Sequence, residues 1–134
     1  MIPSGNTILT TDLTVVTQPS EQHRMDLDKN RIRRTCDSLE AVKQSVYKIL
    51  STERYMYLIY SWNYGIELRD LFGQPTMFVC PELERRIQEA LLQDDRITAV
   101  DGFEFDTTRK GAVSVTFTVH TLFGEFTEGT AVNI

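Results

Sequence analysis

The sequence predicts a small α+β domain, with antiparallel β-hairpins packed on two main helices and extended N- and C-terminal arms. Two stretches, 38–51 and 81–93, carry apolar residues at helical spacing. Residues 112–121 alternate apolar and polar side chains, as a half-buried antiparallel strand does. The length of 134 residues, with 41% hydrophobic and 25% charged residues, is typical of one globular domain.

The N-terminal segment differs in composition from the rest of the chain. Residues 1–21 carry prolines, many threonines and only short apolar pairs, so we expect an extended N-terminal arm that does not contribute to a core. The folded domain is expected to span 22–122. Its first element is a predicted hairpin over 22–34, in which Asp28-Lys29-Asn30 supplies residues that tolerate left-handed turn conformations.

The first helix is predicted over about 38–51. Asp37 stands at the N-cap position, and Glu40 follows three residues later, which is the pattern of a capping box. The apolar residues that follow at helical spacing are Leu39, Val42, Val46, Ile49 and Leu50.

The segment after this helix is strongly aromatic. Residues 54–61 are rich in aromatic and branched side chains and predict a strand or extended segment, which Trp62-Asn-Tyr-Gly65 ends. Residues 66–72 predict a short helical turn. An aromatic platform could stack nucleobases, but in an acidic chain core packing or a protein interface is the favoured interpretation. The aromatic side chains are Tyr55, Tyr57, Tyr60, Trp62, Tyr64 and Phe72.

The C-terminal half predicts a helix followed by a hairpin. Pro81 suits the first position of the second helix. Residues 97–106 are expected to pair with 112–121, with a bulge near Gly102. Residues 123–134 are polar with two isolated aromatics and are assigned to a C-terminal tail. The apolar stripe of the helix is Leu83, Ile87, Ala90 and Leu91.

Composition and charge narrow the classes of function. The net charge of −5 argues against nucleic acid as a partner, because such a partner needs a basic face. No apolar run approaches the ~20 residues of a membrane span, and the first residues lack the pattern of a secretory signal. Cys36 and Cys80 are expected to be reduced thiols, and together with His23 and His120 they lack the spacing of a metal site. No cofactor-binding motif occurs, so neither a metal nor a cofactor is expected.

Two acidic pairs are the candidates for catalysis. Glu67 and Asp70 lie three residues apart, and Asp94 and Asp95 are adjacent. A glycosidase needs two carboxyl groups about 5–9.5 Å apart across a cleft, with separated pKa values. No such cleft is indicated, so solvated positions are favoured and no catalytic residue is assigned. Arg96 is interpreted as a surface charge or as an interface anchor, since its planar guanidinium group makes bidentate contacts.

Three segments together resemble a known protein family. Residues 32–50 resemble its first helix and the basic strand before that helix, and the stretch from Trp62-Asn-Tyr-Gly65 to Leu71 resembles its central glycine loop. Residues 82–100 resemble its second helix, which runs into a Glu-Pro-Arg signature that reads Asp94-Asp95-Arg96 here. The family is that of the XkdS-like and gene-25-like sheath initiators of contractile phage-tail baseplates, a group that includes the type VI secretion protein TssE.

This resemblance implies a structural protein with no catalytic residues, located in the baseplate of a virion tail and assembled in the bacterial cytoplasm. The implied partners are larger baseplate wedge proteins, the tail sheath protein, and tube or hub proteins, with no nucleic acid and no membrane. The signature loop would contact the wedge proteins, the first sheath ring would extend a sheet edge by strand addition, and several copies would surround the tail axis. The implied interface residues are Trp62, Tyr64, Gly65, Asp94, Asp95 and Arg96.

Two alternatives stay open at this point. One is a peptidoglycan-degrading, lysozyme-like enzyme that uses a pair such as Glu67 and Asp70. The other is an unrelated adaptor that binds a different protein through its aromatic cluster. The interface interpretation also carries an expectation about stability: Arg96→Ala should leave the melting temperature nearly unchanged while blocking incorporation into baseplates.

Overall fold

The structure of the protein, a computed structural model, describes residues 20–134. The expected N-terminal arm therefore lies, up to residue 19, outside the described residues. The described part forms a small α+β domain, which confirms the predicted fold class. In chain order its elements are β1 (Gln22–Asp26), β2 (Arg31–Cys36), α2 (Ser38–Leu50), the 3-10 helix η1 (Arg69–Leu71), α3 (Thr76–Leu91), β3 (Ile97–Asp106), β4 (Ala112–Thr121) and β5 (Gly124–Asn133).

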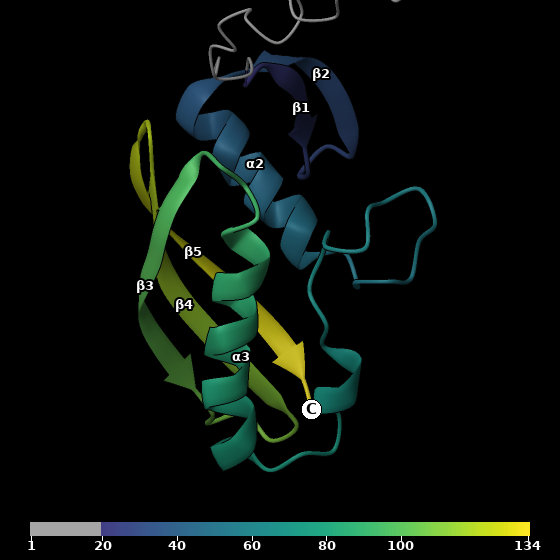
Figure 1. Cartoon of the computed structure of the whole chain (residues 1–134), viewed down its shortest axis with the longest axis vertical. Coiled ribbons are helices and arrows are strands. Elements are labelled where there is room, and N and C mark those ends of the chain that lie inside the picture. Colours follow the sequence, from purple (N-terminus) through teal and green to yellow (C-terminus); the bar gives the residue numbers. More distant parts are fainter. Residues whose placement is uncertain (1–19) are drawn as a thin grey trace, which may run out of the picture.

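Two layers make up the fold (Figure 1). One layer is the antiparallel sheet β3–β4–β5, in which β4 is central. The other consists of α3 and α2, which lie on one face of this sheet, α3 against β3 and α2 against β5. The β1–β2 hairpin is a separate two-stranded sheet beside α2, at the end of the domain away from the C-terminus. The hairpins predicted from the sequence are thus confirmed.

The hydrophobic core lies between the helices and the inner face of the large sheet. Alternate residues of β4 are buried there: Val113, Val115, Phe117 and Val119. The helices contribute Val42, Val46, Ile49, Val79, Leu83, Ile87, Ala90 and Leu91. These positions follow the two-residue period of a strand and the 3.6-residue period of a helix, so both layers turn their apolar faces inward, and burial of that surface holds them together.

The expectation of a C-terminal tail over 123–134 is wrong, because Gly124–Asn133 forms β5. Every residue of β5 pairs in register with β4, from Gly124 opposite Thr121 to Asn133 opposite Ala112. Only Phe126 and Val132 of this strand are buried apolar residues. Between them lie two threonines, a glutamate, a glycine and the exposed Ala131, so the strand lacks the apolar alternation that identifies β4.

Pro81 is not the first residue of the second helix. Helix α3 begins one turn earlier, at Thr76, and Pro75 precedes it as the N-cap residue. The carbonyl of Pro75 accepts the N–H groups of Phe78 and Val79, each at 3.0 Å. Val79 is fully buried, so packing of this extra turn on the core extends the helix past the position that the proline suggests.

Residues 54–61, predicted to be a strand or an extended segment, form neither. This segment is a series of turns, and its base is closed by one isolated bridge between Glu53 and Ile66. A strand needs a neighbour that pairs with its backbone, and β-propensity alone supplies none. The short helical turn expected next is present as η1.

Helix α2 begins as predicted, although its capping differs from a capping box in two respects. Asp37 is the N-cap residue, but its side chain accepts the N–H of Ser38, at 2.7 Å, rather than that of Glu40. The Glu40 carboxylate accepts a hydrogen bond from Arg24 of β1 at 2.5 Å. In a capping box it would instead accept the backbone N–H of Asp37.

The outer face of the large sheet is polar and carries a cross-strand charge cluster. His120 of β4 lies between Asp101 of β3 and Glu125 of β5, with nitrogen–oxygen distances of 2.8 and 3.0 Å. The Asp101 hydrogen bond is the main cause of a raised His120 pKa. Gly102, the residue after Asp101, has a φ of +66° where the β3–β4 register shifts, which confirms the predicted bulge.

Candidate functional site

A surface hollow of about 470 Å³ opens where the end of α2, the end of α3 and the loop 51–68 meet. Five of the six interface residues expected from the sequence line it, although they come from two segments thirty residues apart. They are Tyr64, Gly65, Asp94, Asp95 and Arg96, and the rest of the lining is Ile49, Ser61, Asn63, Ala90 and Gln93.

The base of the loop is closed by a tight backbone contact at Gly65. The Ile66 N–H donates to the Thr52 carbonyl at 3.0 Å, and the Arg54 N–H donates to the Ile66 carbonyl at 3.1 Å. Gly65 has a φ of +91°, and a β-carbon placed on it would lie 2.6 Å from the Thr52 oxygen. A glycine is therefore required for the two ends of the loop to meet.

Side chains anchor the loop to α3. The Arg54 guanidinium group pairs with Glu89 at 3.1 Å and also donates to the Gly65 carbonyl at 3.3 Å. Closer to the hollow, the Asn63 amide donates to the Gln93 side chain at 3.1 Å. The loop is therefore held against the C-terminal half of α3, next to the Asp94–Arg96 turn.

Aromatic stacking organises the rim of the hollow. The Tyr60 and Tyr64 rings stack with centroids 4.7 Å apart, and Tyr57 meets Tyr60 edge-on at 6.0 Å. Burial raises the pKa of the Tyr64 hydroxyl, and the neighbouring Tyr60 and Asp94 add to this shift. Trp62 belongs to the same loop but does not line the hollow, and its side chain is 75% exposed.

The loop presents an unusual run of exposed apolar side chains. All seven are apolar or aromatic residues that are exposed in the described part of the chain: Tyr55, Met56, Tyr57, Leu58, Ile59, Tyr60 and Trp62. We call these residues the apolar loop. Figure 1 shows this segment projecting from the body of the domain beyond the end of α2.

Asp94 and Arg96 form a close ion pair in the wall of the hollow. The Arg96 Nε and Nη2 atoms donate to the two Asp94 oxygens at 3.0 and 2.7 Å, and Nη2 also donates to Ser45 of α2 at 3.0 Å. Burial by itself would raise the pKa of Asp94, but hydrogen bonds from the Arg96 side chain and backbone N–H outweigh it, so that pKa is lowered. The pair thus joins the start of β3 to α2.

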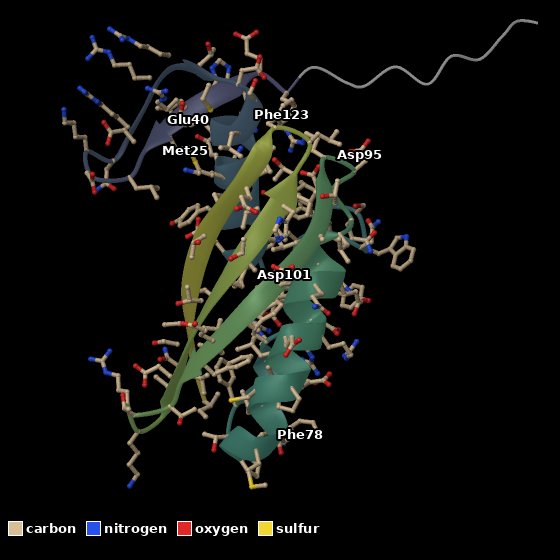
Figure 2. The ribbon with its side chains drawn as sticks, turned by 90° about the vertical axis from the view of Figure 1, so that its left-hand side faces the viewer. Met25, Glu40, Phe78, Asp95, Asp101 and Phe123 are labelled. Atoms are coloured by element: carbon tan, nitrogen blue, oxygen red, sulfur yellow. The ribbon has the colours of Figure 1, made fainter. Side chains whose placement is uncertain are left out.

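Asp95 is exposed, in contrast to its two neighbours. Figure 2 shows it at the edge of the domain, directed away from the sheet. Of the three residues that resemble the family signature, two are therefore occupied by contacts within the domain, and Asp95 alone is free to meet a partner.

Two comparisons with known proteins agree with one another. A sequence model of the family described as the contractile injection system sheath initiator matches residues 4–124. The chain is also 40% identical over 110 residues to the phage-like element PBSX protein XkdS of Bacillus subtilis strain 168, and this similarity covers 79% of this chain and 77% of the relative. The chain belongs to the sheath initiator family of contractile injection systems. The resemblance inferred from the sequence is confirmed.

Membership makes this sheath initiator a structural component of a phage-tail-like contractile machine, associated with other tail components. The two carboxylates of the enzyme alternative, Glu67 and Asp70, do not lie in an environment that favours catalysis. Arg86 pairs with Asp70 and, chiefly by hydrogen bonding, lowers the pKa of that carboxyl, whereas a general acid needs a raised one. Glu67 and Asp70 are exposed and lie outside the hollow.

The sheath initiator offers no evident place for a metal within residues 20–134, where no cluster of three or more His, Cys, Asp or Glu side chains is suited to hold one. Cys36 is a buried free thiol and Cys80 a half-buried one. None of the helices in this part of the chain is long and apolar enough to cross a membrane.

The main functional feature that the sequence analysis missed is the exposure of the apolar loop of this sheath initiator. Residues 54–61 predict a strand by composition, and the structure gives them turns instead. A signal was available, since Tyr57-Leu-Ile-Tyr60 has no polar alternation, which a half-exposed strand would show. Ser45 was also missed, because its contact with Arg96 spans 51 positions.

Proposed function

We propose that this sheath initiator occupies the tail baseplate, binds larger wedge proteins through the hollow and the apolar loop, and accepts a strand from the first sheath ring at β5. The observation that carries the wedge contact is the position of the apolar loop beside the hollow. A contiguous apolar surface rimmed by polar side chains is typical of protein-binding sites. Here the polar rim includes Asp95, Asn63 and Gln93.

The chemistry of the loop suits a protein partner. Burying an exposed Leu58 or Ile59 side chain is worth about 1.5–3 kcal/mol each. Trp62 adds a large aromatic side chain of the kind that dominates binding energy at protein interfaces. Because Gly65 and the anchors to α3 hold the base of the loop, less conformational entropy is lost when a partner covers it.

The paired substitution Leu58→Ser with Trp62→Ala is expected to leave the melting temperature nearly unchanged, because both side chains are exposed. It should weaken wedge binding by about thirtyfold or more, as loss of an aromatic anchor does. Incorporation into baseplates, followed by mass spectrometry of purified particles, measures the effect.

The matched control is Met77→Ser with Phe78→Ala. These are also exposed apolar residues, but they lie at the opposite end of α3 from Asp95 (Figure 2). The proposal is supported if the control enters baseplates at the wild-type level and the loop variant does not. Equal incorporation of the two variants would contradict it.

The second half of the proposal concerns the free edges of the large sheet. β3 and β5 are its outer strands, and neither has a further neighbour among residues 20–134. The pairing of β3 has two register shifts, one of which is the bulge at Gly102, and such irregularities discourage addition of another strand. β5 pairs continuously over ten residues, so its edge is the more regular template.

Lysine on an edge strand discourages strand addition. The substitutions Thr127→Lys and Ala131→Lys on the exposed face of β5 should therefore yield baseplates or tubes without attached sheath. Ser114→Lys and Thr116→Lys place the same charges on the same face of the central strand β4, and they should leave sheathed tails intact. Electron microscopy of tails assembled with each variant, and without the chain, distinguishes the outcomes. Normal sheathed tails from the β5 variant would overturn the strand-addition proposal.

A further inference from the structure

The β1–β2 hairpin carries a concentration of positive charge that the proposed function does not use. Residues 22–36 contain five arginine or lysine residues against two aspartates, in a chain whose net charge is −5. A hollow of about 280 Å³ in this hairpin is lined by Arg24, Asp26, Arg31, Arg33 and Arg34. Figure 2 shows blue-tipped side chains projecting from the hairpin near Met25, away from the rest of the domain.

A β-bulge gathers three of these arginines. His23 pairs with Thr35 and Met25 pairs with Ile32, so Arg24 on β1 faces two residues, Arg33 and Arg34, on β2. Arg34 has a φ of +62°, a left-handed conformation that a non-glycine residue rarely adopts. Like charges opposite one another destabilise a strand pair, and bulges with unusual backbone occur preferentially at functional positions.

The arginines of the bulge are not fully neutralised within the domain. Arg24 pairs with Glu40, and Arg31 approaches Asp26 at 3.6 Å. Within residues 20–134, neither Arg33 nor Arg34 has a carboxylate at ion-pair distance. Both side chains therefore keep donors for an external acceptor, and a guanidinium group binds a carboxylate in a bidentate manner.

The hairpin is a firm platform for this charge. The Met25 N–H donates to the Gln44 side chain of α2 at 2.8 Å, and the Gln44 amide donates to the His23 carbonyl at 2.6 Å. Gln22 donates to the Ala41 carbonyl of the same helix at 2.9 Å. These contacts attach β1 to α2, so the bulge is held in place before any partner arrives.

We propose that this bulge binds an acidic segment of another protein, at a site separate from the hollow and from the β5 edge. Charge complementarity favours carboxylates as the ligand. Ile32, between Arg31 and Arg33 in the sequence, is 68% exposed on the opposite face of β2, so an apolar side chain of a segment that wraps the strand also finds a contact. A nucleic acid fits less well, because its long run of phosphates would extend past the hairpin over a chain whose net charge is −5, whereas a short acidic segment need contact only the bulge.

The test uses the full chain and a fluorescein-labelled peptide in which glutamate alternates with valine. We expect the peptide to bind at low salt, and the paired substitution Arg33→Gln and Arg34→Asn to weaken binding by about threefold to thirtyfold. Asparagine tolerates a positive φ, so the hairpin should be retained. Arg33→Gln alone, at a position of ordinary φ, gives a second variant that leaves Arg34 untouched.

Arg109→Gln with Lys110→Gln is the matched control, because it removes the same two charges from the exposed β3–β4 turn. Loss of peptide binding in the hairpin variants but not in the control supports the proposal. A second labelled peptide, with glutamine in place of every glutamate, should not bind. The proposal is overturned by equal loss in hairpin and control variants, by failure of the glutamate peptide to bind, or by tighter binding of a labelled DNA oligonucleotide under the same conditions.

Discussion

Replacing Gly65 with alanine is expected to lower the free energy of unfolding by about 2–4 kcal/mol. The residue has a φ of +91°, and a β-carbon there would lie 2.6 Å from the Thr52 carbonyl oxygen. The atom that it meets belongs to the backbone and accepts the Ile66 N–H, so it cannot move aside without breaking that bond. Denaturant unfolding of the isolated domain measures the loss.

Gly73→Ala measures the cost of a positive φ in the absence of a close contact. Gly73 also has a positive φ, of +77°, but a β-carbon there meets nothing within 4 Å. We expect it to cost about 1 kcal/mol, from the left-handed conformation alone. If Gly65→Ala were no more harmful than Gly73→Ala, the contact between the two ends of the loop would be looser than the structure indicates.

Arg96→Ala should cost about 2–3 kcal/mol, because it leaves the carboxylate of Asp94 without its main partner in a largely buried position. The two side chains are only 17% and 11% exposed. The substitution also removes the donor to Ser45 and so loosens α2 from the start of β3. The geometry thus replaces the expectation, drawn from the sequence, of a nearly unchanged melting temperature.

The stability contributed by the Asp94–Arg96 ion pair should also depend on pH. The folded-state pKa of Asp94 lies below its ordinary value of 3.8. Its ionised form therefore contributes stability that is present above that ordinary value and is lost as the pH falls through the folded-state pKa. The difference in stability between wild type and Asp94→Asn should shrink over this acidic range, and thermal melts at successive pH values would follow it.

Asp95→Ala is the matched control for both substitutions. Asp95 lies between Asp94 and Arg96 in the sequence, but it is exposed. Its removal should change stability by less than about 0.5 kcal/mol. If Arg96→Ala were equally harmless, the pair would contribute nothing to the fold, and the direct interface role inferred for Arg96 from the sequence would regain its support.

The expected loss of stability in Arg96→Ala affects how assembly experiments are interpreted. A variant at Arg96 that fails to enter baseplates combines an effect on the fold with any effect on a contact. Asp95 and Trp62 are exposed members of the same region, so substitutions there report on partner binding with the fold intact. The six expected interface residues therefore differ in whether they also stabilise the fold.

Residues whose neighbours are close in sequence were predicted well. The hairpin of β3 and β4 follows from apolar alternation and from a turn of five residues, and the bulge at Gly102 from a break in that alternation. The helices follow from apolar spacing. Each of these signals is local, because a strand or helix with one apolar face repeats that face at a fixed period.

Errors arose where neighbours distant in sequence decide the outcome. β5 is a strand because β4 offers its whole length for pairing, although only Phe126 and Val132 indicate an inner face. Residues 54–61 have strand-like composition but no strand beside them, so they remain an exposed loop. Helix α3 begins before Pro81 because the core accommodates Val79.

The fold class, the two helices, the hairpins and the family were all predicted from the residues alone, as was the importance of the two segments around Tyr64 and Arg96. Only the tertiary structure showed that these segments line one hollow, that Arg96 is used internally by Asp94 and Ser45, and that the adjoining loop is exposed. The physical reason is that periodicity records which face of an element is buried, whereas the identity of the neighbour on that face depends on how the whole chain packs.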